Sequence, residues 1–468
     1  MNLAVTGAAF SSAAPVDLAA LSGAVPVNLA APAAEGALTW GAWIAVAIFV
    51  VAYLFIATEW IHRVAAALGG AALMLAFGLT DAEHAFFSEH SGIDWNVIFL
   101  LLGMMLVVSV LKRTGVFEYI AIWAAKRAKG IPFRVMALLC MITAVASAFL
   151  DNVTTVLLIA PVTILVCERL GVPVAPFLIA EVLASNIGGT ATLIGDPPNI
   201  IIASPSRADL KFNDFLVHLA PIVVVLLLVY LVLIRVLFRK AFIYRPERVA
   251  EIMSLKERDA IRDKRLLIVS GIVLAAIMVA FVLHTALGLE PAVVAMLGGL
   301  LLLAVSRLDT EEVVRDVEWP TLVFFAGLFI MVGALVGNGV IGKISQAAAD
   351  ATGGRLWLAT VLLLWLSALL SAIVDNIPYV TSMSPVVSDL VAANGGPGQA
   401  GVLWWALALG ADLGGNATAV GASANVVVLG IAERHGYKIS FWQFTKYGLV
   451  VTVITIAICM PYLWFRYF

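Results

Sequence analysis

Charged residues are scarce in this 468-residue sequence. Asp, Glu, Lys and Arg make up only 12% of it, whereas apolar residues make up 62%. Soluble domains carry about one quarter charged residues, so this composition excludes an ordinary soluble protein and predicts a membrane protein. Uncharged apolar runs that reach or approach the roughly 20 residues needed to span a bilayer support that prediction, with clear cases at 266–283 and 447–465.

Signatures of several other protein classes are also missing. The three cysteines, Cys140, Cys167 and Cys459, are far apart and have no metal-ligand spacing, so we interpret them as apolar helix residues and predict no bound metal. No phosphate-binding Gly-x-x-x-x-Gly-Lys-Ser/Thr loop is present, so this chain is not expected to hydrolyse ATP, and a separate ATPase subunit stays open as a partner. We predict no enzymatic activity, no organic cofactor and no nucleic-acid partner.

The first 38 residues lack Lys and Arg and are rich in Ala, Pro and Ser. A secretory signal has a basic start before a single apolar core, which this segment does not match. We therefore predict that residues 1–38 form a disordered or interfacial tail.

Long apolar segments make up most of the remaining chain. Two of them, 132–170 and 356–394, are interrupted near the middle by polar residues, and we expect each to form a re-entrant hairpin. The others are expected to cross the bilayer, which predicts an all-α polytopic membrane protein with the lipid bilayer as its surroundings. The ten predicted crossings are 40–59, 62–80, 95–111, 174–203, 217–235, 266–286, 290–306, 319–338, 400–430 and 446–465.

A strongly basic segment separates the two halves of the chain. Nine Lys and Arg residues lie within 239–265, and the positive-inside rule predicts that this linker is cytoplasmic. Counting crossings outwards from the linker places both termini outside, and we expect the chain in a bacterial inner membrane. The linker divides an N-terminal repeat, residues 39–238, from a C-terminal repeat, residues 266–468.

An internal repeat relates these halves. A shift of 224 residues aligns Trp95 with Trp319 and Asp151-Asn152 with Asp375-Asn376, and a shift of 226 aligns 188–199 with 414–425. Because four crossings lie between the helix at Trp95 and its counterpart at Trp319, the two helices point in opposite directions. The halves are therefore predicted to form an inverted repeat, a symmetry that places the transport site near the midplane, where interrupted helices of both halves meet.

Four polar motifs interrupt the apolar segments: SAFLDNVTT (147–155), SNIGGTATLIGDPPN (185–199), SAIVDNIPY (371–379) and ADLGGNATAVGASAN (411–425). Their Gly and Pro residues release the backbone from helical hydrogen bonding, and freed amides and carbonyls attract anions and cations respectively. Broken helices are predicted at 174–203 and 400–430. The predicted substrate and ion site consists of Asp151, Asn152, Thr154, Thr155, Asn186, Gly188, Gly189, Thr190, Asp196, Asn199, Asp375, Asn376, Asp412, Gly414, Gly415, Asn416, Thr418 and Asn425.

Four carboxylates lie within these motifs and are the candidate proton carriers. At about 2.5–3.5 kcal/mol each, Asp151, Asp196, Asp375 and Asp412 together oppose membrane insertion by roughly 10 kcal/mol, which predicts a functional use for them. Asp151 and Asp375 could instead serve only as caps of the second arm of each hairpin. For Glu181, just before the first Gly pair, a structural partner and a coupling role both stay open.

The charge of the motifs limits the class of substrate. None of the four contains Arg or Lys, so a multiply charged anion such as citrate would meet carboxylates without basic compensation. A cation, a proton or a neutral hydroxylated solute fits this pattern better.

The motif Asp-Asn-x-Thr-Thr (151–155), followed by the segment 186–199, resembles the ion transporter superfamily that includes arsenical pump membrane proteins (ArsB), the melanosomal P protein and the dicarboxylate/sodium symporters. The segment Glu59-Trp60-Ile61-His62-Arg63 resembles the same group. This resemblance implies an ion transporter fold with two hairpins and two unwound helices. It also implies separate scaffold and transport domains, a homodimer and an elevator-like movement.

The sequence departs from the dicarboxylate pattern because Asp replaces Ser at both hairpin tips and because 422–424 read Ala-Ser-Ala where the first half has Asp-Pro-Pro. These departures disfavour citrate or succinate as the substrate. Bacterial members of the ArsB and P protein group are commonly assigned to arsenite and antimonite efflux, so the resemblance implies a secondary transporter that exports arsenite or antimonite in exchange for protons. A sodium/proton antiporter is the alternative, and a dicarboxylate, citrate or other anion transporter is less favoured. The coupling ion is accordingly a proton or sodium. An intramembrane aspartyl protease is disfavoured because it needs Gly-x-Gly-Asp, whereas 193–196 read Leu-Ile-Gly-Asp.

Overall fold

The computed structural model describes residues 38–58, 60–88, 91–204 and 207–468, and Thr39–Phe468 form one compact unit. The prediction for the N-terminal tail therefore lies, apart from Leu38, outside the described residues. Every regular element in the described ranges is helical, and nine of the helices there are long and apolar enough to cross a membrane. Three shorter apolar helices, Arg63–Ala76, Val174–Gly189 and Pro291–Ser306, add to these.

The described residues of the first half form eleven α-helices. They are α1 (Trp40–Thr58), α2 (Arg63–Ala76), α3 (Ala82–Phe86), α4 (Trp95–Arg113), α5 (Val116–Arg127), α6 (Pro132–Phe149), α7 (Asn152–Leu170), α8 (Val174–Gly189), α9 (Pro197–Ala203), α10 (Phe212–His218) and α11 (Ala220–Leu237). The basic linker that follows contains η2 (Arg239–Ala241), α12 (Pro246–Ser254) and η3 (Glu257–Ala260).

The second half repeats much of this order. It contains α13 (Lys264–Leu287), α14 (Pro291–Ser306), α15 (Thr310–Arg315), α16 (Trp319–Gly337), α17 (Val340–Thr352), α18 (Leu356–Ile373), α19 (Asn376–Ala393), η4 (Gln399–Gly401), α20 (Val402–Gly414), α21 (Ser423–Arg434) and α22 (Phe441–Tyr467). The 224-residue shift places the first residues of α4, α5, α6 and α7 on those of α16, α17, α18 and α19.

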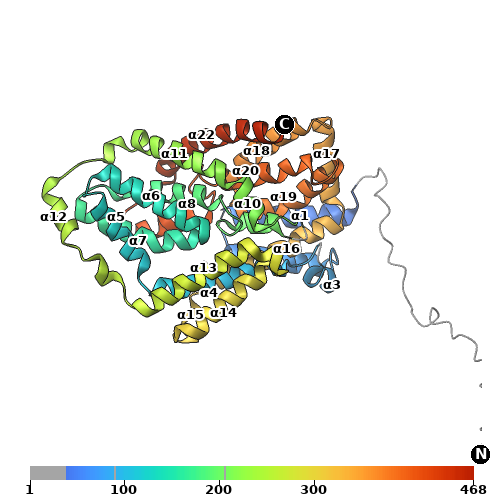
Figure 1. Cartoon of the computed structure of the whole chain (residues 1–468). Helices are drawn as coiled ribbons and strands as arrows, with labels where there is room; N and C mark the ends of the chain where they lie inside the picture. The colour runs from blue at the N-terminus through green and yellow to red at the C-terminus, as the bar shows by residue number, and fades with distance from the viewer. Residues whose placement is uncertain (1–37, 59, 89–90, 205–206) are drawn as a thin grey trace, which may run out of the picture. The chain divides into compact units, whose positions relative to one another are not determined.

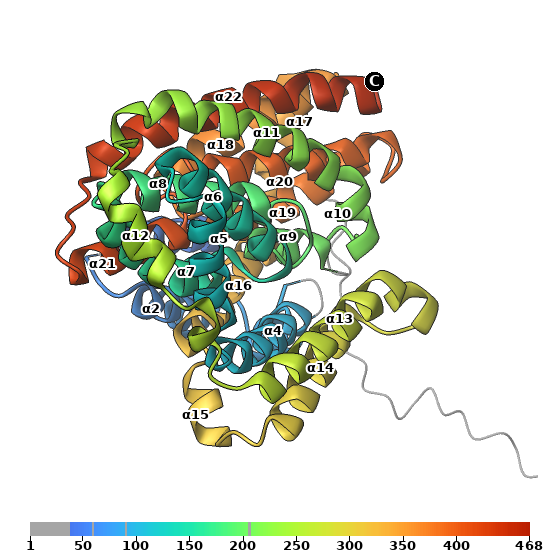
Figure 2. The same ribbon diagram turned by 60° about the vertical axis from the view of Figure 1, so that its left-hand side comes forward.

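The packing of the helices follows the repeat. Helix α4 packs against α14, and its counterpart α16 packs against α2; α7 packs against α21, and its counterpart α19 packs against α9. Figures 1 and 2 show α4, α13 and α14 side by side. In Figure 1, α5 and its counterpart α17 lie at opposite ends of the helical bundle, as expected for halves of opposite orientation.

Glycines set the closest approach between the halves. A Cβ atom added at Gly103 on α4 would lie 2.4 Å from the backbone of Ala295 on α14, and one added at the equivalent Gly327 on α16 would lie 2.9 Å from the backbone of Ala67 on α2. Small residues let membrane helices approach until their backbones touch, so these two glycines permit the close packing of α4 on α14 and of α16 on α2.

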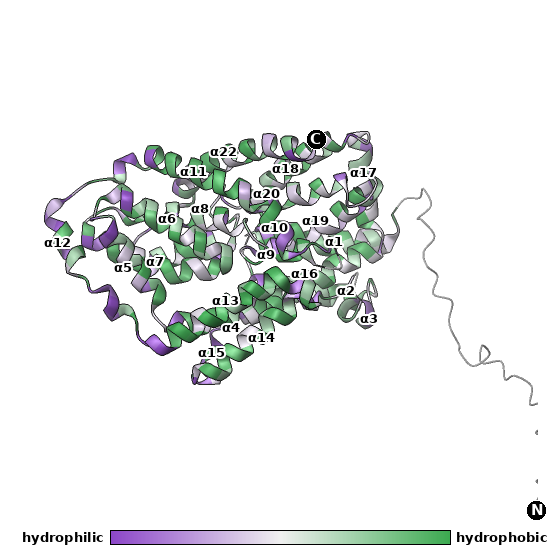
Figure 3. Ribbon diagram, in the orientation of Figure 1, coloured by the Kyte–Doolittle hydropathy of each residue, from purple (hydrophilic) through white to green (hydrophobic). Residues whose placement is uncertain are grey.

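Large apolar side chains cover much of the outer surface of the bundle. Figure 3 shows that α11, α13 and α22 are predominantly hydrophobic along their lengths, whereas α12 and the segments on either side of it are hydrophilic. On α13, Ile268 and Ile272 are more than half exposed. Exposed apolar surface of this extent suits helices in contact with lipid rather than water.

Candidate functional site

Two breaks in otherwise continuous helices form the centre of the site. Helix α8 ends at Gly189 and α9 begins at Pro197, and α20 ends at Gly414 and α21 begins at Ser423. A Cβ added at Gly188 would lie 2.1 Å from the carbonyl oxygen of Ala144, and one added at Gly414 would lie 2.6 Å from the backbone of Ala368. Each broken helix therefore lies directly against the first arm of its own hairpin.

Hydrogen bonds tie each unwound segment to the hairpin in the same way in both halves. Thr192 donates to the carbonyl oxygen of Ala148 at 2.5 Å, and its counterpart Thr418 donates to that of Ala372 at 2.6 Å. The side-chain amide of Asn199 donates back to the carbonyl oxygen of Thr192 at 3.1 Å. Within the second segment, the amide of Asn425 donates to the carbonyl oxygens of Gly415 at 2.8 Å and Thr418 at 2.9 Å.

Asp196 links the tips of the two hairpins. Its Oδ2 accepts a hydrogen bond from the amide of Asn152 at 2.9 Å, and its Oδ1 accepts one from the amide of Asn376 at 3.3 Å. The two asparagines are equivalent in the repeat and open the second arms α7 and α19, while Asp196 itself is 1% exposed. One buried carboxylate therefore joins both halves of the protein.

A second set of contacts crosses between the broken helices. The amide of Asn186, which also accepts a bond from Asn152 at 3.1 Å, donates to Asn416 at 2.9 Å and to Asn425 at 3.1 Å. The repeat places Asp412 at the position equivalent to Asn186, facing Thr190 and Asn199.

The replacement of an amide by a carboxylate changes the chemistry at Asp412. Neither carboxyl oxygen of Asp412 accepts a hydrogen bond of normal geometry from a described residue. The same holds for the side-chain oxygens of Asn152, Thr155 and Asn199, so several buried acceptors of the site have no donor there.

Asp151 and Asp375 cap the second arms of the hairpins. Asp151 Oδ1 accepts the backbone amide of Thr154 at 2.7 Å, and its Oδ2 accepts the Thr154 hydroxyl at 2.5 Å. Asp375 accepts the backbone amide of Ile377 at 3.1 Å. Both carboxylates lie at the tips but outside the hydrogen-bond network around Asp196, although each is close enough to interact with Asp196 electrostatically.

Arg63 is a site residue that the motif analysis missed. It is the first residue of α2, its Nη1 lies 3.8 Å from Asp375 Oδ2, and it donates to the hydroxyl of Ser423 at 2.8 Å. Ser423 in turn donates to Asp375 at 2.5 Å. A basic side chain in the first turn of a helix opposes the helix dipole, and this misplaced charge is the sequence signal that could have revealed a partner.

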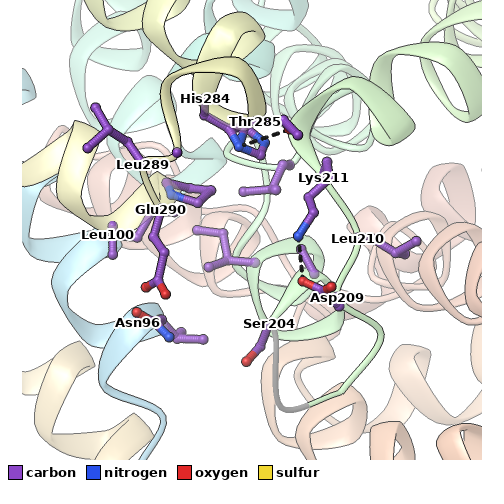
Figure 4. Close-up of a pocket in the computed structure, with 17 residues that line it drawn as sticks. Asn96, Leu100, Ser204, Asp209, Leu210, Lys211, His284, Thr285, Leu289 and Glu290 are labelled. Carbon is purple, nitrogen blue, oxygen red and sulfur yellow. Dashed lines mark hydrogen bonds and ion pairs between the residues drawn. The ribbon is translucent and has the colours of Figure 1, made fainter.

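Two cavities flank the centre at positions related by the repeat. One, of about 300 Å³, is lined by His62, Arg63, Asp375 and Ser423 together with apolar residues that include Ile61, Phe324 and Val426. The other, of about 330 Å³, lies between α4, the α9–α10 connection and the α13–α14 turn (Figure 4). Its residues Thr285, Leu100 and Ile200 are the repeat equivalents of Ile61, Phe324 and Val426.

Comparison with known proteins places these features in a family. The chain matches the CitMHS citrate transporter family over residues 53–410, which is most of its length. The chain belongs to the CitMHS family. It is 56% identical over 424 residues to a 46 kDa membrane protein of Mycobacterium leprae, covering 91% of this chain and 98% of that protein. It is 54% identical over 425 residues to an uncharacterized transporter of Mycobacterium tuberculosis, with the same two coverages.

More distant relatives agree with the predicted resemblance. The chain is 34% identical over 496 residues to the human P protein, covering 90% of this chain but only 59% of the P protein. The solved structure of the YdaH transporter of Alcanivorax borkumensis has the same fold, with a TM-score of 0.53 over 92% of this chain and 99% of that one, at 14% identity. The predicted superfamily and the predicted all-α inverted-repeat fold are thus confirmed, and this CitMHS protein is an integral membrane transporter.

Proposed function

We propose that this CitMHS protein is a secondary transporter that exports arsenite or antimonite as the neutral trihydroxide, in exchange for protons. The observation that carries the proposal is the set of buried oxygen acceptors without donors on Asn152, Thr155 and Asn199, next to the carboxyl of Asp412, which faces the neutral side chains of Thr190 and Asn199. A trihydroxide has three O–H donors and no charge, so it needs hydrogen-bond acceptors and no counter-ion. Buried acceptors left unpaired cost about 1–3 kcal/mol each, which such a solute would recover on binding.

The charges around the centre support exchange with protons. Asp196 and Asp412 are buried and interact electrostatically with each other, and none of the salt bridges described for the chain involves either of them. Two carboxylates buried close together without a cation are stable mainly when a proton is present, so proton binding and release are natural steps at this site. We propose Asp196 and Asp412 as the principal carriers, with Asp151 and Asp375 as further candidates.

Sodium/proton exchange is the second candidate function, because the unpaired oxygen atoms of the site could also bind a sodium ion. Sodium binds side-chain and backbone oxygens, and the unwound segments 190–196 and 415–422 offer both. The carbonyl oxygens of Gly415 and Thr418 already accept from Asn425, so the unpaired side-chain oxygens and the remaining carbonyl oxygens of these segments are the candidate ligands.

The name of the family raises citrate as a third candidate, and Arg63 is the relevant residue. Arg63 and His62 line the cavity of about 300 Å³, where they could attract an anion. However, Arg63 is engaged with Asp375 and Ser423, and no basic side chain among the described residues lies within hydrogen-bonding distance of Asp196 or Asp412. The described site therefore favours a neutral or cationic substrate over a tricarboxylate.

Flux measurements on purified protein in liposomes test the three candidates together. With an imposed pH gradient, we expect arsenite to move against the proton flow, and we expect the movement to collapse when an ionophore dissipates the gradient. Sodium movement without arsenite movement would establish the antiporter instead. Citrate uptake in the absence of both would overturn the proposal.

A further inference from the structure

Glu181 is a buried carboxylate that the site described above does not use. It lies on α8, is 1% exposed, and contacts both arms of the first hairpin. Its Oε1 accepts the hydroxyl of Thr143 on α6 at 3.1 Å and the hydroxyl of Thr163 on α7 at 3.0 Å. Its Oε2 is buried and has no hydrogen-bond partner among the described residues.

The duplicated half shows that the fold does not require this carboxylate. The shift of 226 residues places Leu407 at the position of Glu181, and the shift of 224 places Ser367 at that of Thr143. Ser367 pairs there with the hydroxyl of Tyr379 at 2.9 Å, and the residue equivalent to Thr163 is Val387, so neither the acid nor both of its hydroxyl partners are repeated in the second half. Retaining an acid in one half only is expected of a functional group rather than of a scaffold.

The groups facing Glu181 provide no counter-charge. Its titratable neighbours are Cys140 on α6, Cys167 on α7 and Tyr230 on α11, and the hydroxyl of Tyr230 donates to the carbonyl oxygen of Ala180 at 2.7 Å. No Lys, Arg or His of the described residues acts on it. An isolated carboxylate within a membrane protein is costly, and because both threonine hydroxyls donate to Oε1, Oε2 is the atom available to bind a proton.

We propose that Glu181 is a second proton-binding site of the transport cycle, separate from the carboxylates at the centre. Because Glu181 contacts both arms of the hairpin, any movement of α6 and α7 against α8 changes the surroundings of its carboxyl group and therefore its affinity for a proton. Glu181 lies five residues before Asn186 on the same helix, about 7.5 Å along the axis, so the site is adjacent to the network around Asp196 but outside it. The inference rests on the proposed coupling to protons.

Infrared difference spectra of the full chain in lipid bilayers, recorded between acidic and alkaline pH, test the proton directly. We expect a carbonyl-stretch band from a protonated carboxyl group that titrates in the native protein and disappears in Glu181→Gln. Thr143→Val and Thr163→Val should move this band to higher frequency, because each removes one hydrogen bond to the carbonyl oxygen. Asp389→Asn, which changes an exposed carboxylate that accepts from Ser345, is the matched control and should leave the band unchanged.

Proton counting in liposomes tests the role in the cycle. Glu181→Gln should still move substrate, with fewer protons exchanged for each solute. A carbonyl-stretch band that is unchanged in Glu181→Gln would overturn the proposal. If Glu181→Gln does not fold, a band that is unchanged in both threonine variants would overturn it instead. Loss of the band in Glu181→Gln with a native number of protons exchanged would also overturn it. Absence of arsenite flux with a titrating Glu181 band would count against the proposed substrate but not against the proton site.

Discussion

At the hairpin tips, the side chains of Asp151 and Asp375 both cap a helix and carry a negative charge, and a substitution can remove the charge without removing the cap. Each caps a helix by accepting a backbone amide. Asparagine caps helices about as well as aspartate, so Asp→Asn removes the charge and keeps the cap.

We therefore expect both Asp151→Asn and Asp375→Asn to insert normally and to lose at least tenfold in coupled flux. Asp151→Asn should unfold within about 0.5 kcal/mol of the native protein, whereas Asp375→Asn should lose about 1 kcal/mol because it also breaks the ion pair with Arg63. Thermal unfolding in detergent and liposome flux provide the two measurements. Asp389→Asn, the same change on the outer part of α19, should alter neither. Native flux in both tip variants would reduce these residues to caps.

Arg63 and Asp375 form an ion pair whose side chains are 34% and 17% exposed. Because the pair is partly screened, we expect a coupling free energy of about 1 kcal/mol in a double-mutant cycle of Arg63→Gln and Asp375→Asn, measured by unfolding. The combination of Arg63→Gln with Asp389→Asn should be additive. Additivity in both cycles would show that the pair contributes nothing to stability.

At the level of helices, the glycines of the broken segments are constrained by their neighbours. Gly188→Ala and Gly414→Ala would each drive a methyl group into the backbone of the adjacent hairpin arm. We expect a loss of about 1–3 kcal/mol in stability for each, as for other overpacked sites. Gly430→Ala on α21, where no atom lies within 4 Å of an added Cβ, is the control and should be neutral or slightly stabilising.

The linker is held against α5 by Lys126, which donates to Glu257 at 2.6 Å and to the carbonyl oxygen of Leu255 at 3.0 Å. The hydrogen bond from Lys126 lowers the pKa of Glu257 below its ordinary value. A lowered pKa in the folded state means that this contact stabilises the docked linker above the ordinary glutamate pKa and is lost as the pH falls below it.

Hydrogen exchange of residues 246–260, corrected for intrinsic rates, should therefore show faster exchange at pH 4 than at pH 7 in the native protein. Glu257→Gln should exchange fast at both values. Glu251→Gln, which changes a residue paired with Arg248 within α12, should keep the native pH response. A pH response that survives in Glu257→Gln would assign it to another group.

The sequence predicts the elements well because their signals are local. The hairpins expected at 132–170 and 356–394 coincide with α6–α7 and α18–α19, and both predicted broken helices are interrupted at their glycine pairs. The contact between Arg63 and Ser423 joins residues 360 positions apart, so the local pattern around Arg63 could indicate that it has a partner but not that the partner is Ser423. Asp412 of the second half faces Thr190 and Asn199 of the first half, and the sequence could not predict this because it depends on how the two halves pack together.

At the scale of the whole molecule, the two flanking cavities are predicted to open on opposite sides of the membrane. Leu289 lines one and Val426 lines the other, while the native cysteines are buried and should react slowly with thiol reagents. In sealed cells, a membrane-impermeant maleimide should label Leu289→Cys from outside. Val426→Cys should be labelled only in inverted vesicles. Labelling of both from the same side would contradict the predicted orientation.

The two halves of this protein repeat the same helices but not the same charged residues. Asp196 binds both hairpin tips, whereas the repeat places Ala422 at the equivalent position of the second half. In an alternating-access cycle the halves exchange roles, and a fully symmetric pair would make the inward-facing and outward-facing states equal in free energy. Because Asp196 has no acidic equivalent in the second half, the two states would differ in free energy. The resting transporter would then favour either the inward-facing or the outward-facing state, and protonation of Asp196 would change the ratio of the two states.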